Sequence, residues 1–100
     1  MIRRGTTPTH IWTIPFDAEQ VKDVRASYSQ NDKEIIVKTF ENVAVSDKEI
    51  KIELTQEETF SLEEGSVDMQ LRILTADDKV VNTDIITKDV YKALNEEVLK

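Results

Sequence analysis

The chain has 100 residues, a length typical of one domain, with 39% hydrophobic and 33% charged residues. This composition excludes a disordered chain and a membrane-spanning one, and it predicts a soluble globular domain with one buried core. The net charge of −7 comes without any basic stripe, which excludes nucleic acid and anionic membranes as partners. Because there is no cysteine, disulfides, zinc–thiolate sites and cysteine nucleophiles are excluded as well.

β-branched residues favour strands, and the chain contains ten Val, ten Ile and ten Thr against six Leu and five Ala. Its first eight residues are polar and include Arg3 and Arg4, so we expect residues 1–8 to form a flexible arm that orders only against a partner. No apolar core of a signal peptide follows, and no apolar run approaches the ~20 residues of a spanning helix. We therefore expect neither a signal sequence nor a membrane anchor.

The first half of the chain alternates between apolar and polar residues, the pattern of half-buried strands. Residues 9–16 predict one strand and residues 24–28 a second, which Asn31 and Asp32 turn into a third over 35–40. After a short apolar segment at 43–45 and a turn at 46–48, the cleanest alternation predicts a strand over 50–54.

The second half begins with a helix signal. Thr55 and Glu58 have the spacing of a capping box, which predicts one helical turn near 55–60. Strands are expected over 67–73 and 80–87, joined by a turn at Asp77 and Asp78. Val90, Tyr91, Leu94 and Val98 then fit one face of an amphipathic helix over 88–100.

These elements predict an all-β fold, a small antiparallel immunoglobulin-like β-sandwich of six to seven strands over residues 9–87. The C-terminal residues 88–100 are expected to add a helix or tail. The predicted interior consists of Trp12, Ile14, Phe16, Val24, Ala26, Tyr28, Ile50, Ile52, Leu54, Val67, Met69, Leu71 and Ile73.

Few residues in the chain suit catalysis. His10 is the single histidine, and its place beside Trp12 on a predicted strand favours packing over general acid–base chemistry. With glycine only at positions 5 and 65, no phosphate-binding loop can be written. We therefore predict that the protein is not an enzyme, with no catalytic residue and no cofactor.

Carboxylates are the remaining candidates for chemistry, as calcium ligands. One set comprises Glu57, Glu58, Glu63, Glu64 and Asp68, and a second set comprises Asp77, Asp78 and Asp84. Calcium requires six to eight converging oxygens, and neither set has EF-hand spacing. A hydrated acidic surface and plain turns explain the two sets better, so we expect no metal.

Four blocks of the sequence carry a resemblance to known proteins: RRGTTP at 3–8, IWTIPFD at 11–17, LTQEET at 54–59 and VDMQLRIL at 67–74. Together they resemble a group of small uncharacterised proteins encoded in tailed-phage and prophage gene clusters of Gram-positive bacteria, over most of 1–87. The organisation is also similar to the N-terminal β-sandwich of phage baseplate upper proteins, whereas residues 88–100 depart from the group's pattern. The resemblance implies a virion or assembly component without enzyme activity, in the bacterial host cytoplasm during assembly and in the virion.

The sequence therefore leads to two hypotheses about function, a preferred one and an alternative. The first is a phage structural or assembly protein that contacts other phage structural proteins or copies of itself. The alternative is an acidic regulatory or inhibitory module that occupies a basic groove through residues 53–68. Contacts with other chains are expected at the two ends, through Arg3, Arg4, Val90, Tyr91, Leu94 and Val98. The apolar stripe of the last four must be buried, and packing against the sandwich itself is favoured over packing against a neighbouring chain.

Overall fold

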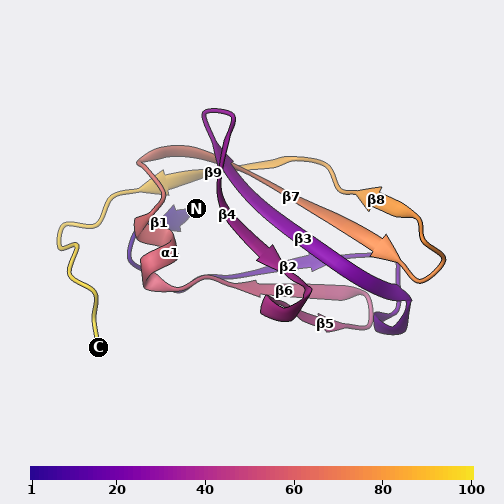
Figure 1. The fold of residues 1–100 in the computed structure, drawn as a ribbon. Coiled ribbons are helices and arrows are strands. Elements are labelled where there is room, and N and C mark those ends of the chain that lie inside the picture. The colour runs from indigo at the N-terminus through magenta and orange to yellow at the C-terminus, as the bar shows by residue number, and fades with distance from the viewer.

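The computed structural model describes all 100 residues, and its larger sheet has six strands (Figure 1). The strand order is β1-β9-β7-β3-β4, and β8 pairs with the part of β7 that β9 leaves free. These strands are β1 (Ile2–Arg3), β3 (Val21–Gln30), β4 (Lys33–Thr39), β7 (Gly65–Thr75), β8 (Val80–Asn82) and β9 (Ile86–Tyr91).

The second layer is a three-stranded sheet in the order β2-β6-β5. Its strands are β2 (Thr9–Thr13), β5 (Ala44–Ser46) and β6 (Glu49–Glu53), and helix α1 (Gln56–Phe60) follows β6. The order corresponds to the immunoglobulin sandwich, with β2, β6 and β5 in the places of strands B, E and D, and β3, β7 and β9 in those of C, F and G. The predicted all-β fold is confirmed. The strands number nine rather than six or seven, because β1 was not predicted and the single strand expected over 80–87 is two strands, β8 and β9.

The core lies between the two layers and contains sixteen buried apolar residues. Eleven of the thirteen predicted interior residues are among them, while Trp12 and Phe16 are only partly buried at its margin. The five that the pattern missed are Ile2, Val21, Ile36, Leu62 and Val90.

Local sequence signals correctly predicted the turn at Asn31 and Asp32 and the start of the helix at Thr55. Asn31 and Asp32 both have positive φ, 51° and 61°, as the β3–β4 hairpin requires of a two-residue turn of type I′. The capping box is also present, since the Glu58 amide donates to Thr55 Oγ1 at 3.1 Å and the Thr55 amide donates to Glu58 Oε1 at 2.8 Å. Helix α1 is five residues long, and no helix of the protein has the length and hydropathy to cross a bilayer.

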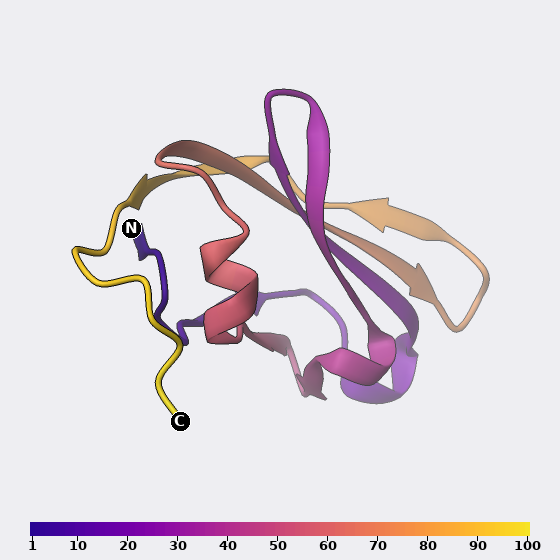
Figure 2. The same cartoon turned by 60° about the vertical axis from the view of Figure 1, so that its left-hand side comes forward.

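The two ends of the chain differ from the predictions. Instead of a separate flexible arm, the first residues form β1, which pairs with β9 in parallel and buries Ile2 completely. The predicted helix over 88–100 is wrong: residues 86–91 form β9, and the chain continues beyond it without regular structure. The reason is that Ile86, Lys88 and Val90 also alternate, and β7 offers them a pairing edge. Figure 2 shows both ends of the chain on the side of the molecule that carries α1.

Candidate protein-binding surfaces

Arg4, predicted as a contact residue, is used inside the fold. Its Nε donates to the Leu62 carbonyl at 2.8 Å and its Nη2 to the Phe60 carbonyl at 2.9 Å. The guanidinium also lies 5.6 Å from the centre of the Phe60 ring and forms an ion pair with Glu96. These contacts satisfy two carbonyls at the end of α1, so Arg4 fastens the N-terminal segment to the helix.

The other predicted contact residues divide into two groups. Arg3 lies 5.5 Å from the centre of the Tyr91 ring, which is 41% exposed, and Val90 beside it is buried. Leu94 is 99% exposed and Val98 partly exposed on the irregular tail, so they form no stripe with Val90. The structure therefore brings Arg3, Arg4, Val90 and Tyr91 together and leaves Leu94 and Val98 apart.

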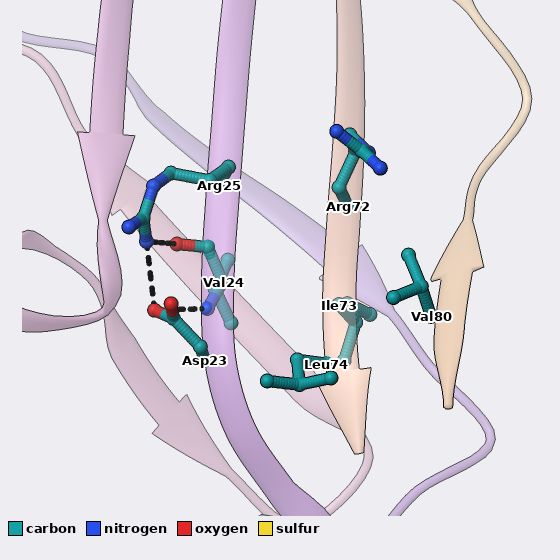
Figure 3. A pocket seen from close by; sticks show the side chains of 7 residues that line it. All are labelled: Asp23, Val24, Arg25, Arg72, Ile73, Leu74 and Val80. Atoms are coloured by element: carbon teal, nitrogen blue, oxygen red, sulfur yellow. Dashed lines mark hydrogen bonds and ion pairs between the residues drawn. The ribbon is translucent and has the colours of Figure 1, made fainter. Parts of the chain in front are cut away.

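A surface that the sequence did not reveal lies on the outer face of the six-stranded sheet, where Arg25 of β3 stands directly opposite Arg72 of β7 (Figure 3). Arg25 turns toward Asp23, to which its Nη1 donates at 2.7 Å, while Arg72 Nε donates to Asn82 Oδ1 at 3.1 Å. Like charges at directly opposed positions destabilise a sheet. The arginine pair therefore lowers the stability of this part of the sheet. It also places two positive groups on one face of a chain whose net charge is −7.

Apolar side chains flank this arginine pair. A shallow pocket of about 150 Å³ lies between the strands, with Leu74 and Val80 in its lining (Figure 3). A neighbouring hollow of about 410 Å³ is mostly polar: besides Arg72 and Ile85, its lining includes the carboxylates of Asp32, Glu34 and Asp68. Val80 is 57% and Ile85 62% exposed. We name this region, defined by Arg25, Arg72, Leu74, Val80 and Ile85, the arginine face.

Both arginines occupy outward positions of predicted strands, so their exposure was predictable from alternation. Their opposition was not, because it depends on β3 pairing with β7 and on the register, which shifts between Val21 and Asp23.

A third surface is the open side of the sandwich at β2. A cleft of about 460 Å³ there is lined by His10 and Trp12 of β2 and by Met69, Ile86 and Lys88 of the other sheet. The imidazole Nδ1 of His10 lies 2.7 Å from the hydroxyl of Tyr28, which is buried.

The two ring groups of this contact both favour their neutral forms. The pKa of His10 is lowered from 6.5 to about 4, mainly by burial and to a smaller extent by the positive charges of Lys88 and the amino terminus. Burial raises the pKa of Tyr28, with a smaller contribution from the charge of Glu58. His10 is therefore uncharged at neutral pH and joins the two layers by a neutral hydrogen bond.

The candidate calcium ligands do not converge. Asp77 accepts a hydrogen bond from Thr75, and Asp78 forms an ion pair with Lys22 at 2.9 Å. Asp68 accepts from the Thr87 hydroxyl at 2.6 Å. No three His, Cys, Asp or Glu side chains come together in the geometry of a metal site.

Comparison of the chain with protein-family models, with curated proteins and with solved structures finds no match.

Proposed function

We propose that this protein is a non-enzymatic structural or assembly protein of a phage particle, a tail, baseplate or connector accessory, that acts through protein–protein contacts. The phage setting follows from the sequence resemblance. The contact role is supported by one observation, the arginine face, where two opposed guanidinium groups stand among exposed apolar side chains.

Arginine with apolar neighbours is a composition enriched in the energetic centres of protein interfaces. Arg25 is paired with Asp23 on one side only, and Arg72 bonds a neutral amide, so both retain donors for a partner. A partner carboxylate would accept hydrogen bonds from the free donors of either guanidinium group. The favoured partner surface therefore presents an acidic side chain beside apolar residues.

Co-purification with the products of neighbouring genes tests this proposal. We expect a stoichiometric complex with a phage structural protein, and we expect mass spectrometry to find the chain in purified particles. Arg72→Glu combined with Val80→Asp should abolish the complex, because it reverses one charge and makes the pocket wall polar.

Lys33→Glu combined with Val37→Asp is the matched control, since it makes the same two kinds of change at exposed residues of β4. A complex that survives in the arginine-face variant would contradict the arginine face as the contact. A gene neighbourhood without phage structural genes would contradict the phage setting.

The acidic regulatory or inhibitory module remains the second candidate, and it also has an observation in its favour. Glu57, Glu63 and Glu64, in or just after α1, are exposed and take part in none of the protein's ion pairs. In this case Glu63→Lys with Glu64→Lys would abolish binding to a basic partner, and the arginine-face variant would leave it intact.

A further inference from the structure

The edge of β2 differs from every other free edge in the protein. Its five residues include no charged side chain, and Ile11 at its centre is 56% exposed. The seven-residue edge strand β4 carries Lys33, Glu34 and Lys38, while β5 and β8 have only three residues each and β1 two. Charge and shortness are the usual protections of an edge against pairing with another chain, and β2 has neither charge nor minimal length.

The direction of the free backbone groups on β2 follows from its pairing with β6. The Leu54 amide donates to the Pro8 carbonyl at 3.0 Å, and the Ile14 amide donates to the Lys48 carbonyl at 2.9 Å. In an antiparallel pair, bonded positions alternate with non-bonded ones, so the even-numbered residues of β2 face β6. The N–H and C=O groups of Thr9, Ile11 and Thr13 therefore point away from the sheet.

We propose that a second copy of this chain pairs with this edge, β2 against β2 in antiparallel orientation, on a two-fold axis at Ile11. The inference rests on the proposed contact function and names a partner and a surface for it. In this register Ile11 faces Ile11 of the second copy, and Thr9 faces Thr13 in both directions. Each of these three pairs exchanges two backbone hydrogen bonds, so every outward group of the strand is satisfied.

The side chains favour a second copy over an unrelated strand. The sequence Thr-His-Ile-Trp-Thr has the same character read from either end, with Thr at both ends and a ring beside the central Ile on each side. A two-fold axis at Ile11 therefore brings like residues together without opposing any charges, as a self-complementary interface requires. The two small sheets would join into one continuous sheet, with the exposed Ile11 side chains in cross-strand contact.

Sedimentation velocity over a wide concentration range, on the full chain, measures this association. We expect a reversible dimer. Ile11→Lys should weaken it by at least about tenfold, because it sets two like charges opposite each other across the axis. Val37→Lys is the matched control, since it places the same charge at an exposed β-branched residue on β4, at the edge of the other sheet and outside the arginine face, and it should leave the dimer intact.

Cysteine cross-linking tests the register, and the absence of native cysteine makes it specific. Bonded antiparallel pairs place their Cα atoms about 5.5 Å apart, within the range of a disulfide. Ile11→Cys should therefore cross-link to itself on oxidation. Thr9→Cys mixed with Thr13→Cys should also cross-link, whereas neither of these two alone should do so.

A wild-type chain that stays monomeric at all concentrations would overturn the inference, as would Val37→Lys weakening the dimer as much as Ile11→Lys. Self-linking of Thr9→Cys alone would show a parallel pairing or an antiparallel pairing in another register, and either would also overturn it. None of these results touches the arginine face. The proposed function fails separately, if the partner complex survives in the chain that carries both Arg72→Glu and Val80→Asp.

Discussion

The centre of the larger sheet and the two ends of the chain are held by different kinds of interaction. At the centre, β3 and β7 pair over almost their whole lengths, and Val24, Ala26 and Leu71 on their inner faces are almost completely buried. At the ends, β1 and β9 share two paired positions, and Ile2 and Val90 are the buried apolar side chains there. The centre therefore depends on repeated burial, and the ends depend on a few individual contacts.

Polar groups provide most of the individual contacts at the ends. The Thr59 hydroxyl accepts from the Gly5 amide and donates to the Thr6 carbonyl, both at 2.9 Å, and Thr59 is fully buried. Arg4 adds its bonds to two carbonyls of the α1 region. Because only a few contacts hold the ends, a single substitution removes a larger share of the stabilising contacts there than at the centre.

The largest effect is expected from Leu71→Ala at the centre. Leu71 is fully buried, so its truncation leaves a cavity between the layers and should lower the free energy of unfolding by about 2–5 kcal/mol. Urea denaturation measures this loss. Ile85→Ala removes an exposed isoleucine and should change stability by less than about 0.5 kcal/mol. Equal effects of the two substitutions would contradict the assignment of Leu71 to the core.

A smaller loss, about 1–3 kcal/mol, is expected from Gly5→Ala at the ends. Gly5 has φ of +80°, and a Cβ atom there would lie 2.5 Å from Phe60 Cζ, so the ring would have to move from beneath Arg4. Gly65→Ala is the control: its φ is +135°, yet no atom lies within 4 Å of the added Cβ. Thermal melts of the two variants separate steric conflict from backbone strain, and a Gly5→Ala chain as stable as wild type would show that the ends adapt freely.

Alternation in the sequence predicted the centre well and the ends poorly, for a physical reason. A strand buried on one face repeats its signal over many residues, and in β7 that signal covers Val67, Met69, Leu71 and Ile73. Strand β1 has two residues and cannot show a period, although Ile2 is fully buried. In β9 the apolar positions satisfied a helical spacing as well, and only the available edge of β7 decides between the two structures.

The binding surfaces were predictable only in part. Alternation placed Trp12 and Phe16 inside, but β2 lies at the edge of its sheet, so the open side leaves Trp12 only partly covered. Phe16 is also partly covered and lies beyond the end of β2, in the bend before β3. The alternation alone predicted that Arg25 and Arg72 face outward, whichever strands theirs pair with. Their opposition, like the symmetry of β2 about Ile11, has meaning only once the pairing of the strands is known.

The contact between His10 and Tyr28 adds a polar component to the centre, and its pH dependence tests it. The pKa of His10 is about 4 in the folded protein and 6.5 in the unfolded chain, so between these values the unfolded state binds more protons. The contribution of neutral His10 to the free energy of unfolding is fully present above pH 6.5 and is lost as the pH falls toward 4. Because His10 is only partly buried and therefore screened, the loss should be about 1–2 kcal/mol.

His10→Gln isolates this contribution, since glutamine can still bond the Tyr28 hydroxyl but does not titrate in this range. The difference in unfolding free energy between wild type and variant should be constant above pH 6.5 and should shift against the wild type below it. Parallel stability curves down to pH 4 would contradict a buried neutral imidazole.

The smallest effect is expected from deleting residues 93–100, and it defines where the terminal region stops contributing to the fold. The tail makes an ion pair between Glu96 and Arg4, with Glu96 54% exposed, and two 2.9 Å hydrogen bonds between Gln56 and the backbone of Leu99. Exposed ion pairs and hydrogen bonds contribute little, so the deletion should lower the unfolding free energy by less than about 1 kcal/mol.

Deleting residues 90–100 is the contrasting truncation, because it also removes Val90, which is 2% exposed, and both positions at which β9 pairs with β1. The chain should then lose several times more stability than in the shorter deletion, as measured by urea denaturation. The boundary between core and tail therefore lies at the end of β9, between Tyr91 and Ala93. If the shorter deletion were as costly as the longer one, the tail itself would be stabilising the ends, and the polar contacts of Arg4 would have to depend on Glu96.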